Sequence, residues 1–170
     1  MKHAAGVRKE LGFRTIFNLL GPLTNPANAH SQVLGVFDVK WVKPLAEVLR
    51  DLGCSHSMVV HGSDGLDEIT LTGESHVAEL KNEGVTCYRL DPEKLGFKTC
   101  SSDDLKGGTP EENAVTLKNI LNGEAGPRRD IVVLNSAAAI YVAGKSDSIE
   151  SGIQLANISI ESGQAREKLE

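Results

Sequence analysis

Three carboxylates lie close together in the segment His-Gly-Ser-Asp-Gly-Leu-Asp-Glu, residues 61–68, at Asp64, Asp67 and Glu68. The two glycines of this segment allow its backbone to bend, so the carboxylates can gather around a hard divalent cation. Magnesium typically takes one or two protein carboxylates, and waters and substrate phosphates supply its other ligands. The segment can therefore form a magnesium site, although its residue types alone favour an acidic turn in water. Adjacent residues of a strand point to opposite faces, so a shared ion at Asp67 and Glu68 requires the backbone to turn there.

A second segment combines fixed positive charge with a stiff backbone. The run from Arg8 to Pro26 begins like an amphipathic helix and ends in Gly-Pro-Leu-Thr-Asn-Pro, residues 21–26. Proline fixes its own φ and restricts the residue before it, so we expect a rigid loop that can form one wall of a small-molecule pocket. Arg8 and Arg14 supply charge nearby. The alternative is an ordinary connection between a helix and a strand.

Two further motifs favour structural roles. The stretch Gly-Gly-Thr-Pro-Glu-Glu-Asn, residues 107–113, could cradle a phosphate, but Thr109 and Glu112 have the spacing of a helix capping box. Acidic residues in a first helical turn would also repel phosphate. His56 and His61 fit no zinc signature, so we expect them to be hydrogen-bonded structural histidines.

The elements that must position these residues begin with a strand, a helix and a second strand. Residues 32–37 and 57–61 are short apolar runs typical of buried strands. Between them, residues 42–52 carry apolar side chains at helical spacing, and Gly53 ends the helix. This order predicts parallel pairing with a right-handed crossover. The carboxylate segment then lies at the carboxyl end of a strand, where open α/β sheets bind ligands.

The later elements are expected to be shorter strands followed by helices. Residues 68–71, 76–80 and 85–90 indicate strands separated by turns at Gly73 and Gly84. Residues 109–121 indicate a helix, Gly126–Asp130 a turn, and the residues after Asp130 a long helix whose small residues 136–139 allow close packing. The tail, 148–170, is helical in character with a weak point at Ser162-Gly163. The fold class is α/β with a mixed sheet.

Composition limits the partners of the chain. The 170 residues have a formal net charge of -5, which argues against nucleic acid or an anionic membrane as the main partner. No apolar run is long enough to cross a bilayer. Three cysteines without paired spacing favour neither a disulfide framework nor a zinc site, so a reducing cytoplasm fits best. The sequence opens directly in a helical pattern, as if cut from a longer chain.

The two segments together resemble anthranilate phosphoribosyltransferases, and the resemblance covers essentially the whole chain. Residues 8–26 are similar to the segment that closes the anthranilate pocket, and Asp-Gly-Leu-Asp-Glu, residues 64–68, to the magnesium loop. The resemblance implies a fold of the nucleoside phosphorylase/phosphoribosyltransferase class III type, with a mixed, partly parallel sheet flanked by helices. It also implies two short N-terminal helices from a helical domain that is otherwise absent.

The resemblance also implies a reaction and a set of site residues. A 5-phosphoribosyl group would pass from phosphoribosyl pyrophosphate to the amine of anthranilate, with release of pyrophosphate, in tryptophan biosynthesis. Arg8 would pair with the anthranilate carboxylate, Pro22 would contact its ring, and Asn25 is a weaker candidate. Asp67 and Glu68 would hold Mg²⁺. Such a displacement relies on positioning and on charge neutralisation, so we assign no general base.

The largest departure from the family lies before this region. Complete members are about twice as long and carry a helical domain, a Gly-Thr-Gly-Gly-Asp diphosphate loop and a Lys-His-Gly segment, none of which occurs here. We therefore expect residues 1–27 to pack on the absent domain and residues 28–170 to form the C-terminal part of the α/β domain. We also expect the chain to be inactive alone. The family is homodimeric, largely through the absent part, so the oligomeric state of this chain stays open.

Two alternatives remain. A pyrimidine nucleoside phosphorylase shares the fold and the phosphate chemistry, but it has no use for a magnesium pair at Asp67 and Glu68. A non-enzymatic relative that binds nucleic acid should show a basic stripe, whereas this chain has 23 acidic residues against 18 basic ones. We therefore expect small-molecule substrates, with neither nucleic acid nor a membrane as partner.

Overall fold

The computed structural model describes residues 6, 10, 17–24 and 29–169 of the chain. Its central element is a four-stranded sheet in the order β1-β2-β3-β4. The strands are β1 (Ser31–Gly35), β2 (His56–Gly62), β3 (Ser75–Lys81) and β4 (Gly84–Leu90). β1 and β2 are parallel, whereas the β2–β3 and β3–β4 pairs are antiparallel. The predicted mixed, partly parallel sheet is confirmed.

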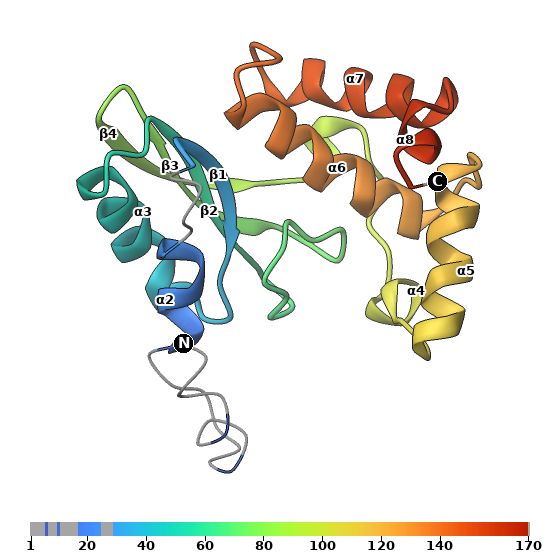
Figure 1. Cartoon of the computed structure of the whole chain (residues 1–170), viewed down its shortest axis with the longest axis horizontal. Coiled ribbons are helices and arrows are strands. Elements are labelled where there is room, and N and C mark those ends of the chain that lie inside the picture. The colour runs from blue at the N-terminus through green and yellow to red at the C-terminus, as the bar shows by residue number, and fades with distance from the viewer. Residues whose placement is uncertain (1–5, 7–9, 11–16, 25–28, 170) are drawn as a thin grey trace.

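Helices cover both faces of this sheet (Figure 1). The α-helices are α2 (Phe17–Leu23), α3 (Val42–Asp51), α4 (Ser102–Leu105), α5 (Pro110–Leu121), α6 (Pro127–Val142), α7 (Ile149–Glu161) and α8 (Gln164–Glu167). Within the described residues, two 3-10 turns, η2 (Val39–Trp41) and η3 (Glu93–Leu95), lie in connections. Figure 1 places α2 and α3 on one side of the sheet and α6 on the other, with α5, α7 and α8 beyond α6.

The unit β1–α3–β2 forms as its sequence pattern predicts. Val59 of β2 belongs to the core that the sheet makes with α3, whereas Met58 and Val60 belong to the core that it makes with α6. All three side chains are buried. Alternate residues of a strand face opposite sides, so a strand covered on both faces must be apolar throughout.

Residues 68–71 do not form the predicted strand. Ile69 and Leu71 are buried, which explains the apolar pattern, but their backbone does not join the sheet ladder. The amide of Thr70 donates to Ser75 Oγ at 3.0 Å and the amide of Ile69 donates to Asn135 Oδ1 at 3.0 Å. Side chains therefore satisfy the backbone groups that a neighbouring strand would otherwise bond.

The turn of the β3–β4 hairpin also differs from expectation. Gly84 is the first residue of β4, and the turn is made by Asn82 and Glu83, with φ of 50° and 64°. Positive φ at both central residues is the geometry that matches the twist of a two-residue hairpin.

The first residues of the predicted rigid loop at 21–26 are helical instead, because α2 continues through Gly21 and Pro22 to Leu23, and residues 25 and 26 lie outside the described part. Proline lacks an N–H, so the helix loses one bond to the carbonyl of Asn18. The helix ends at Thr24, whose hydroxyl donates to the Leu20 carbonyl at 3.0 Å. Leu19 is buried in the core shared with α3, so α2 packs on the sheet domain. The residues of the other predicted N-terminal helix lie almost wholly outside the described part.

The C-terminal helices follow the predicted order, with one earlier start. Thr109 caps α5 through a complete capping box with Glu112, as predicted. The predicted turn at 126–130 is instead the first turn of α6, because Gly126, with φ of 139°, precedes Pro127 at the first helical position. The weak point at Ser162-Gly163 separates α7 from α8.

The small residues of α6 allow α7 to pack closely, as expected. A Cβ added to Gly152 of α7 would lie 2.7 Å from the carbonyl oxygen of Ala137. The close approach of these two helices fixes α6 from the side opposite the sheet.

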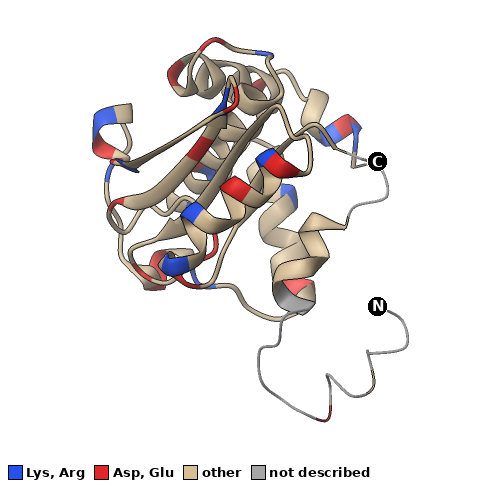
Figure 2. Cartoon of the chain, turned by 90° about the vertical axis from the view of Figure 1, so that its left-hand side faces the viewer, with Lys and Arg blue, Asp and Glu red and all other residues tan. Residues whose placement is uncertain are grey.

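No described helix is both long and apolar enough to span a bilayer. On the side of the molecule shown in Figure 2, basic and acidic residues are interspersed along the described helices and strands. This distribution differs from the basic stripe expected of a nucleic-acid-binding relative.

Candidate functional site

A cavity of about 390 Å³ lies where β1 and β2 end beside α6. Its lining comprises Val33 and Gly35 of β1, Val60 of β2, Asp67 and Glu68 of the following loop, and Ile131, Val132, Asn135 and Ser136 of α6. The carboxyl ends of two parallel strands therefore meet at this position, which is where open α/β sheets bind ligands. We refer to it as the Asp67–Glu68 cavity.

Both members of the predicted metal pair face this single cavity. Asp67 and Glu68 lie in a bend rather than in a strand, so the alternation that would send them to opposite faces does not apply. Both are exposed, and neither carboxylate has a hydrogen bond or ion pair within the described part of the chain. The two groups keep their full capacity to accept bonds from a ligand.

The third carboxylate of the segment does not join the pair. Asp64 Oδ2 accepts hydrogen bonds from the hydroxyls of Thr70 at 2.6 Å and Thr72 at 2.8 Å, and Oδ1 accepts one from the amide of Leu66 at 3.1 Å. Burial alone would raise the pKa of Asp64, but these hydrogen bonds outweigh it and lower the pKa. Asp64 closes the loop, so the expectation of three gathered carboxylates is wrong.

Two glycines allow the loop to lie against the strand ends. A Cβ at Gly62 would approach Asp64 Oδ1 to 2.5 Å. A Cβ at Gly35 would overlap the backbone carbonyl oxygen of Asp67, which two non-bonded atoms cannot do. The backbone of Asp67 therefore rests directly on β1, in space that only glycine leaves open. Sequence reasoning did not identify Gly35, although a glycine inside an apolar strand is a known sign of close backbone approach.

Asn135 connects the other side of the loop to α6. Its Nδ2 donates to the carbonyl of Ile69 at 2.8 Å and to that of Ile131 at 3.0 Å. Its Oδ1 accepts the amide of Ile69 at 3.0 Å. The sequence analysis did not single out Asn135. A polar residue on the buried face of a helix was the signal that could have identified it.

His61 supports the end of β1. Its Nδ1 lies 2.7 Å from the carbonyl oxygen of Val36, so this nitrogen carries the proton and donates to Val36. The interpretation of His61 as a hydrogen-bonded structural histidine is confirmed.

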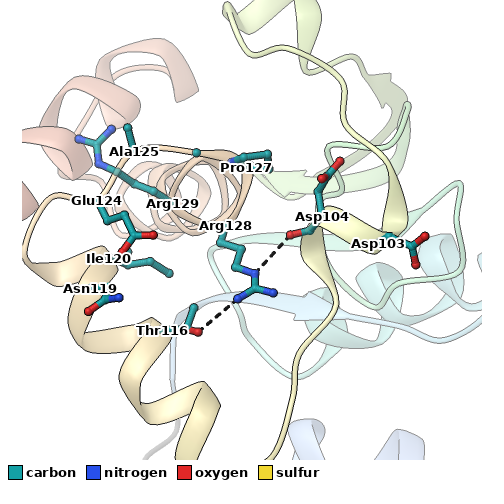
Figure 3. A pocket seen from close by; sticks show the side chains of 11 residues that line it. Asp103, Asp104, Thr116, Asn119, Ile120, Glu124, Ala125, Pro127, Arg128 and Arg129 are labelled. Carbon is teal, nitrogen blue, oxygen red and sulfur yellow. Dashed lines mark hydrogen bonds between the residues drawn. The ribbon is translucent and has the colours of Figure 1, made fainter.

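A larger cavity, of about 460 Å³, lies between α5 and the start of α6 (Figure 3). Its central guanidinium, Arg128, donates to the backbone carbonyls of Asp104 and Lys106 and to the hydroxyl of Thr116. Figure 3 shows the side chain of Arg128 extended between the segment of Asp104 and Thr116. Because all three of its nitrogens donate hydrogen bonds that join the segments of α4 and α5 to α6, we assign this cavity a structural role.

The Gly107-Gly108 stretch is likewise structural. The amide of Gly108 donates to Asn113 Oδ1 at 2.8 Å, and the amide of Thr109 donates to Glu112 Oε2 at 2.7 Å. The N–H groups that a phosphate would need are therefore bonded to side chains of α5 itself.

A second polar cluster lies at the other end of the sheet, around Glu79 of β3. Glu79 Oε1 accepts from Tyr141 OH of α6 at 2.7 Å and lies 3.1 Å from His56 Nε2, and Oε2 accepts from Tyr88 OH at 3.0 Å. Lys81 Nζ donates to Tyr141 OH at 2.9 Å. His56 is thus structural, as expected. We call these five residues the Glu79 cluster.

Hydrogen bonding determines the ionisation of the Glu79 cluster. Burial opposes the charge of Glu79, but the bonds from Tyr141, His56 and Tyr88 outweigh it and lower the pKa of this carboxyl. Burial, followed by the charge of Glu79, raises the pKa of Tyr88. Glu79 is therefore ionised and both phenols are neutral at neutral pH.

The remaining predicted site residues lie elsewhere. Arg8, Arg14 and Asn25 fall outside the described residues. Pro22 is exposed in α2 and, within the described part, does not line the Asp67–Glu68 cavity. The structure thus brings together the two predicted metal ligands, and the anthranilate residues stay predictions.

The donor set around Asp67 and Glu68 suits one kind of metal site. The described residues contain no group of three or more His, Cys, Asp or Glu side chains that could enclose an ion. A metal that requires a full protein cage does not fit. Mg²⁺ keeps waters and binds through one or two carboxylates together with substrate phosphates, so it fits this pair.

Residues 1–166 match the model of the glycosyl transferase family, a/b domain. The chain belongs to this family. The match covers nearly all of the chain, including both segments that carry the resemblance. It agrees with the sheet topology and with the position of the cavity at the strand ends.

Curated relatives are named anthranilate phosphoribosyltransferase. The protein of this name from Methanobrevibacter smithii is 56% identical over 170 residues, which is 100% of this chain and 51% of the relative. That from Acetivibrio thermocellus is 57% identical over 170 residues and 49% of the relative. The chain therefore spans about half the length of the relatives it matches.

Solved structures agree with these relatives. Anthranilate phosphoribosyltransferase from Thermus thermophilus superimposes with a TM-score of 0.89 at 48% identity, over 98% of this chain and 49% of that one. The Saccharomyces cerevisiae enzyme in complex with PRPP and Mg gives a TM-score of 0.88 at 28% identity, over 99% of this chain and 49% of that one. The resemblance seen in the sequence, and the fold that it implies, are confirmed.

Proposed function

We propose that this chain is part of an anthranilate phosphoribosyltransferase, in which Asp67 and Glu68 bind magnesium on the diphosphate of phosphoribosyl pyrophosphate. The observation that carries this proposal is the cavity itself: two adjacent carboxylates without protein partners in the described part of the chain face one space at the carboxyl ends of parallel strands. The S. cerevisiae relative was solved with PRPP and Mg, which supports the same ligands here.

The chain contributes charge and shape to this reaction. Bound magnesium would neutralise charge on the leaving pyrophosphate. Asp67 and Glu68 would hold the metal and, through it, the diphosphate, beside the apolar side chains of Val33, Val60 and Val132.

We assign the binding of the acceptor, anthranilate, to the N-terminal segment. Arg8 would bind the anthranilate carboxylate through its guanidinium fork, and Pro22 would contact the ring, with Asn25 as a weaker candidate for the same pocket. A second S. cerevisiae structure, in complex with 4-fluoroanthranilate, supports an aromatic acid as the acceptor. A pyrimidine nucleoside phosphorylase remains the weaker alternative, because it does not explain the open carboxylate pair.

We further propose that residues 1–170 do not catalyse the transfer on their own, since the matched relatives are about twice as long. A cytoplasmic location is proposed from the three free cysteines, Cys54, Cys87 and Cys100. Formation of phosphoribosyl anthranilate by the isolated chain would contradict the first of these two proposals.

Calorimetry tests the metal assignment. Titration of the chain with phosphoribosyl pyrophosphate in the presence of Mg²⁺ should give a binding signal that is lost when Mg²⁺ is chelated. The variant Asp67→Ala, Glu68→Ala should bind at least about tenfold more weakly, since ligand removal exceeds the effect of outer-shell changes. The matched control Asp103→Ala removes an exposed carboxylate that does not line the cavity, and it should bind like the unchanged chain. Identical signals from all three proteins would remove the assignment.

A further inference from the structure

The Asp67–Glu68 pair is held on both sides by groups that are not themselves ligands. On one side the backbone of Asp67 rests on Gly35 of β1. On the other side Ile69, the residue after the pair, is bound through both its N–H and its C=O to the side chain of Asn135. The pair thus lies between a strand and a helix, with a fixed contact at each end.

The side-chain carboxamide of Asn135 is well suited to holding Ile69 in place. Two bonds to one residue fix its position and its rotation, in the same way that paired strands fix each other. The carboxamide orientation is determined by its partners, because a flipped group would place NH₂ against the Ile69 amide and oxygen against two carbonyls. The third bond, to Ile131 one turn earlier, prevents the side chain from adopting another rotamer.

The helix that carries Asn135 is rigidly attached to the rest of the molecule. Leu134 and Ala138 of α6 are buried in the core that α6 forms with the sheet. Arg128 joins the first turn of α6 to the segments around α4 and α5. Ile69 itself is fully buried in the same core as Leu134. A displacement of the loop would therefore break both packing and hydrogen bonds.

We propose that Asn135 is a positioning residue, which acts with Gly35 to hold Asp67 and Glu68 facing one cavity so that the pair can receive a divalent cation bound to diphosphate. The inference rests on the proposed function for the identity of the ligand. It adds two residues that do not touch the metal. Because adjacent side chains normally diverge, convergence of this pair depends on the bend that these contacts maintain.

We call the contact of Gly35 with Asp67 and the bonds of Asn135 to Ile69 the clamp. Two measurements on the chain test the clamp and the binding of the metal separately. The first is amide hydrogen exchange at Ile69, which reports the Asn135 bond whether or not any metal binds. The second is water-proton relaxation during titration with the Mn²⁺–pyrophosphate complex, in which Mn²⁺ replaces Mg²⁺ as a paramagnetic probe. The variants are Asn135→Leu, which removes all three hydrogen bonds, and Gly35→Ala, which forces the Asp67 backbone away from β1. Asn135→Ser, which is smaller, replaces Asn135→Leu if that variant does not fold.

Both kinds of variant should weaken Mn²⁺–pyrophosphate binding by about tenfold to a hundredfold, as loss of outer-shell partners does at other metal sites. Exchange at Ile69 should be faster in the Asn135 variants. Val142→Ala removes buried volume at the far end of α6, so it controls for lost stability and should retain the affinity of the unchanged chain.

Three results would overturn the proposal in distinguishable ways. Unchanged exchange at Ile69 would remove the clamp. Unchanged affinity in the Asn135 variants, or an equal loss in Val142→Ala, would reduce Asn135 to a purely structural residue. Absence of binding to the unchanged chain would overturn the metal assignment, and the positioning role with it, while the exchange data would still show whether the clamp exists.

Discussion

Helix α6 contacts a carboxylate-bearing segment of the sheet domain at two positions, one in its middle and one near its end. The carboxylates are left without protein partners in the described part at the first position and are hydrogen-bonded at the second. In the middle of the helix, Asn135 holds a loop whose Asp67 and Glu68 have no partner in the described part of the chain. Near its end, Tyr141 donates to Glu79, which also interacts with His56 and Tyr88. One helix thus supports an open pair at one position and a saturated carboxylate at the other.

The two positions differ in the side-chain group that α6 presents and in the group to which it bonds. Tyr141 uses its hydroxyl to bond the carboxylate directly, so Glu79 has little capacity left for a ligand. Asn135 bonds the backbone beside the pair and leaves both carboxylates open. A partly buried carboxylate with three donors stabilises the fold, whereas two exposed carboxylates without donors repel each other weakly and leave their oxygens open to a cation. Unsatisfied bonding capacity in a cavity therefore distinguishes the candidate site from a structural cluster.

The largest expected effect is on the Glu79 cluster. Glu79→Ala removes the acceptor of three donors, and we expect the free energy of unfolding to fall by about 3 kcal/mol, because partly buried groups are left unpaired. Urea unfolding at pH 7 measures this change. Tyr88→Phe removes one bond and should cost about 1 kcal/mol. Equal losses in both variants would show that the cluster does not act as a shared network.

A smaller effect is expected from pH. The pKa of Glu79 in the folded chain is below its ordinary value of 4.5, so its contribution to stability is complete above that value and is lost as pH falls through the folded pKa. Asp64 and Asp104, whose pKa values are also lowered, add to the same trend. The urea midpoint should therefore fall between about pH 5 and about pH 3, and it should fall less steeply in Glu79→Gln. An identical slope in that variant would contradict the assigned role of Glu79.

The smallest effect on stability is expected at the open pair. Asp67→Asn, Glu68→Gln removes two exposed charges without protein partners in the described part of the chain, so the free energy of unfolding should change by no more than about 0.5 kcal/mol. The same variant should bind Mg²⁺ and phosphoribosyl pyrophosphate more weakly, by calorimetry. A marked loss of stability would show that these carboxylates have stabilising partners. It would contradict the contrast between the open pair and the Glu79 cluster.

Much of the fold could be predicted from local patterns. Residues 42–52 repeat apolar side chains at helical spacing, and α3 ends at Asp51, close to the predicted end. Thr109 and Glu112 form the predicted capping box. These features depend only on residues within one or two helical turns, so the local sequence is enough to predict them. The strands β1 and β2 were predicted for the same reason, since each contains a short apolar run.

The errors occurred where distant residues decide the local structure. Residues 68–71 have the apolar pattern of a strand, but Asn135 and Ser75 satisfy the backbone of Ile69 and Thr70. Pro22 indicated the end of a helix, yet α2 continues to Leu23 while Leu19 packs on the sheet core. Asp64 matched its neighbouring carboxylates in chemistry, and only the folded loop directed it toward Thr70 and Thr72.

The sequence by itself determined the class of fold and the place of the carboxylates after a buried strand, and its family resemblance predicted Asp67 and Glu68 as the metal pair. The first two conclusions follow from residue type and spacing, and the third follows from the resemblance. Tertiary structure alone decided that both carboxylates face one cavity, because that depends on the contact of Gly35 with Asp67 and on the bonds of Asn135 to Ile69. Asn135 lies 66 positions from Ile69 along the chain. Only packing of α6 against the sheet brings the two residues together.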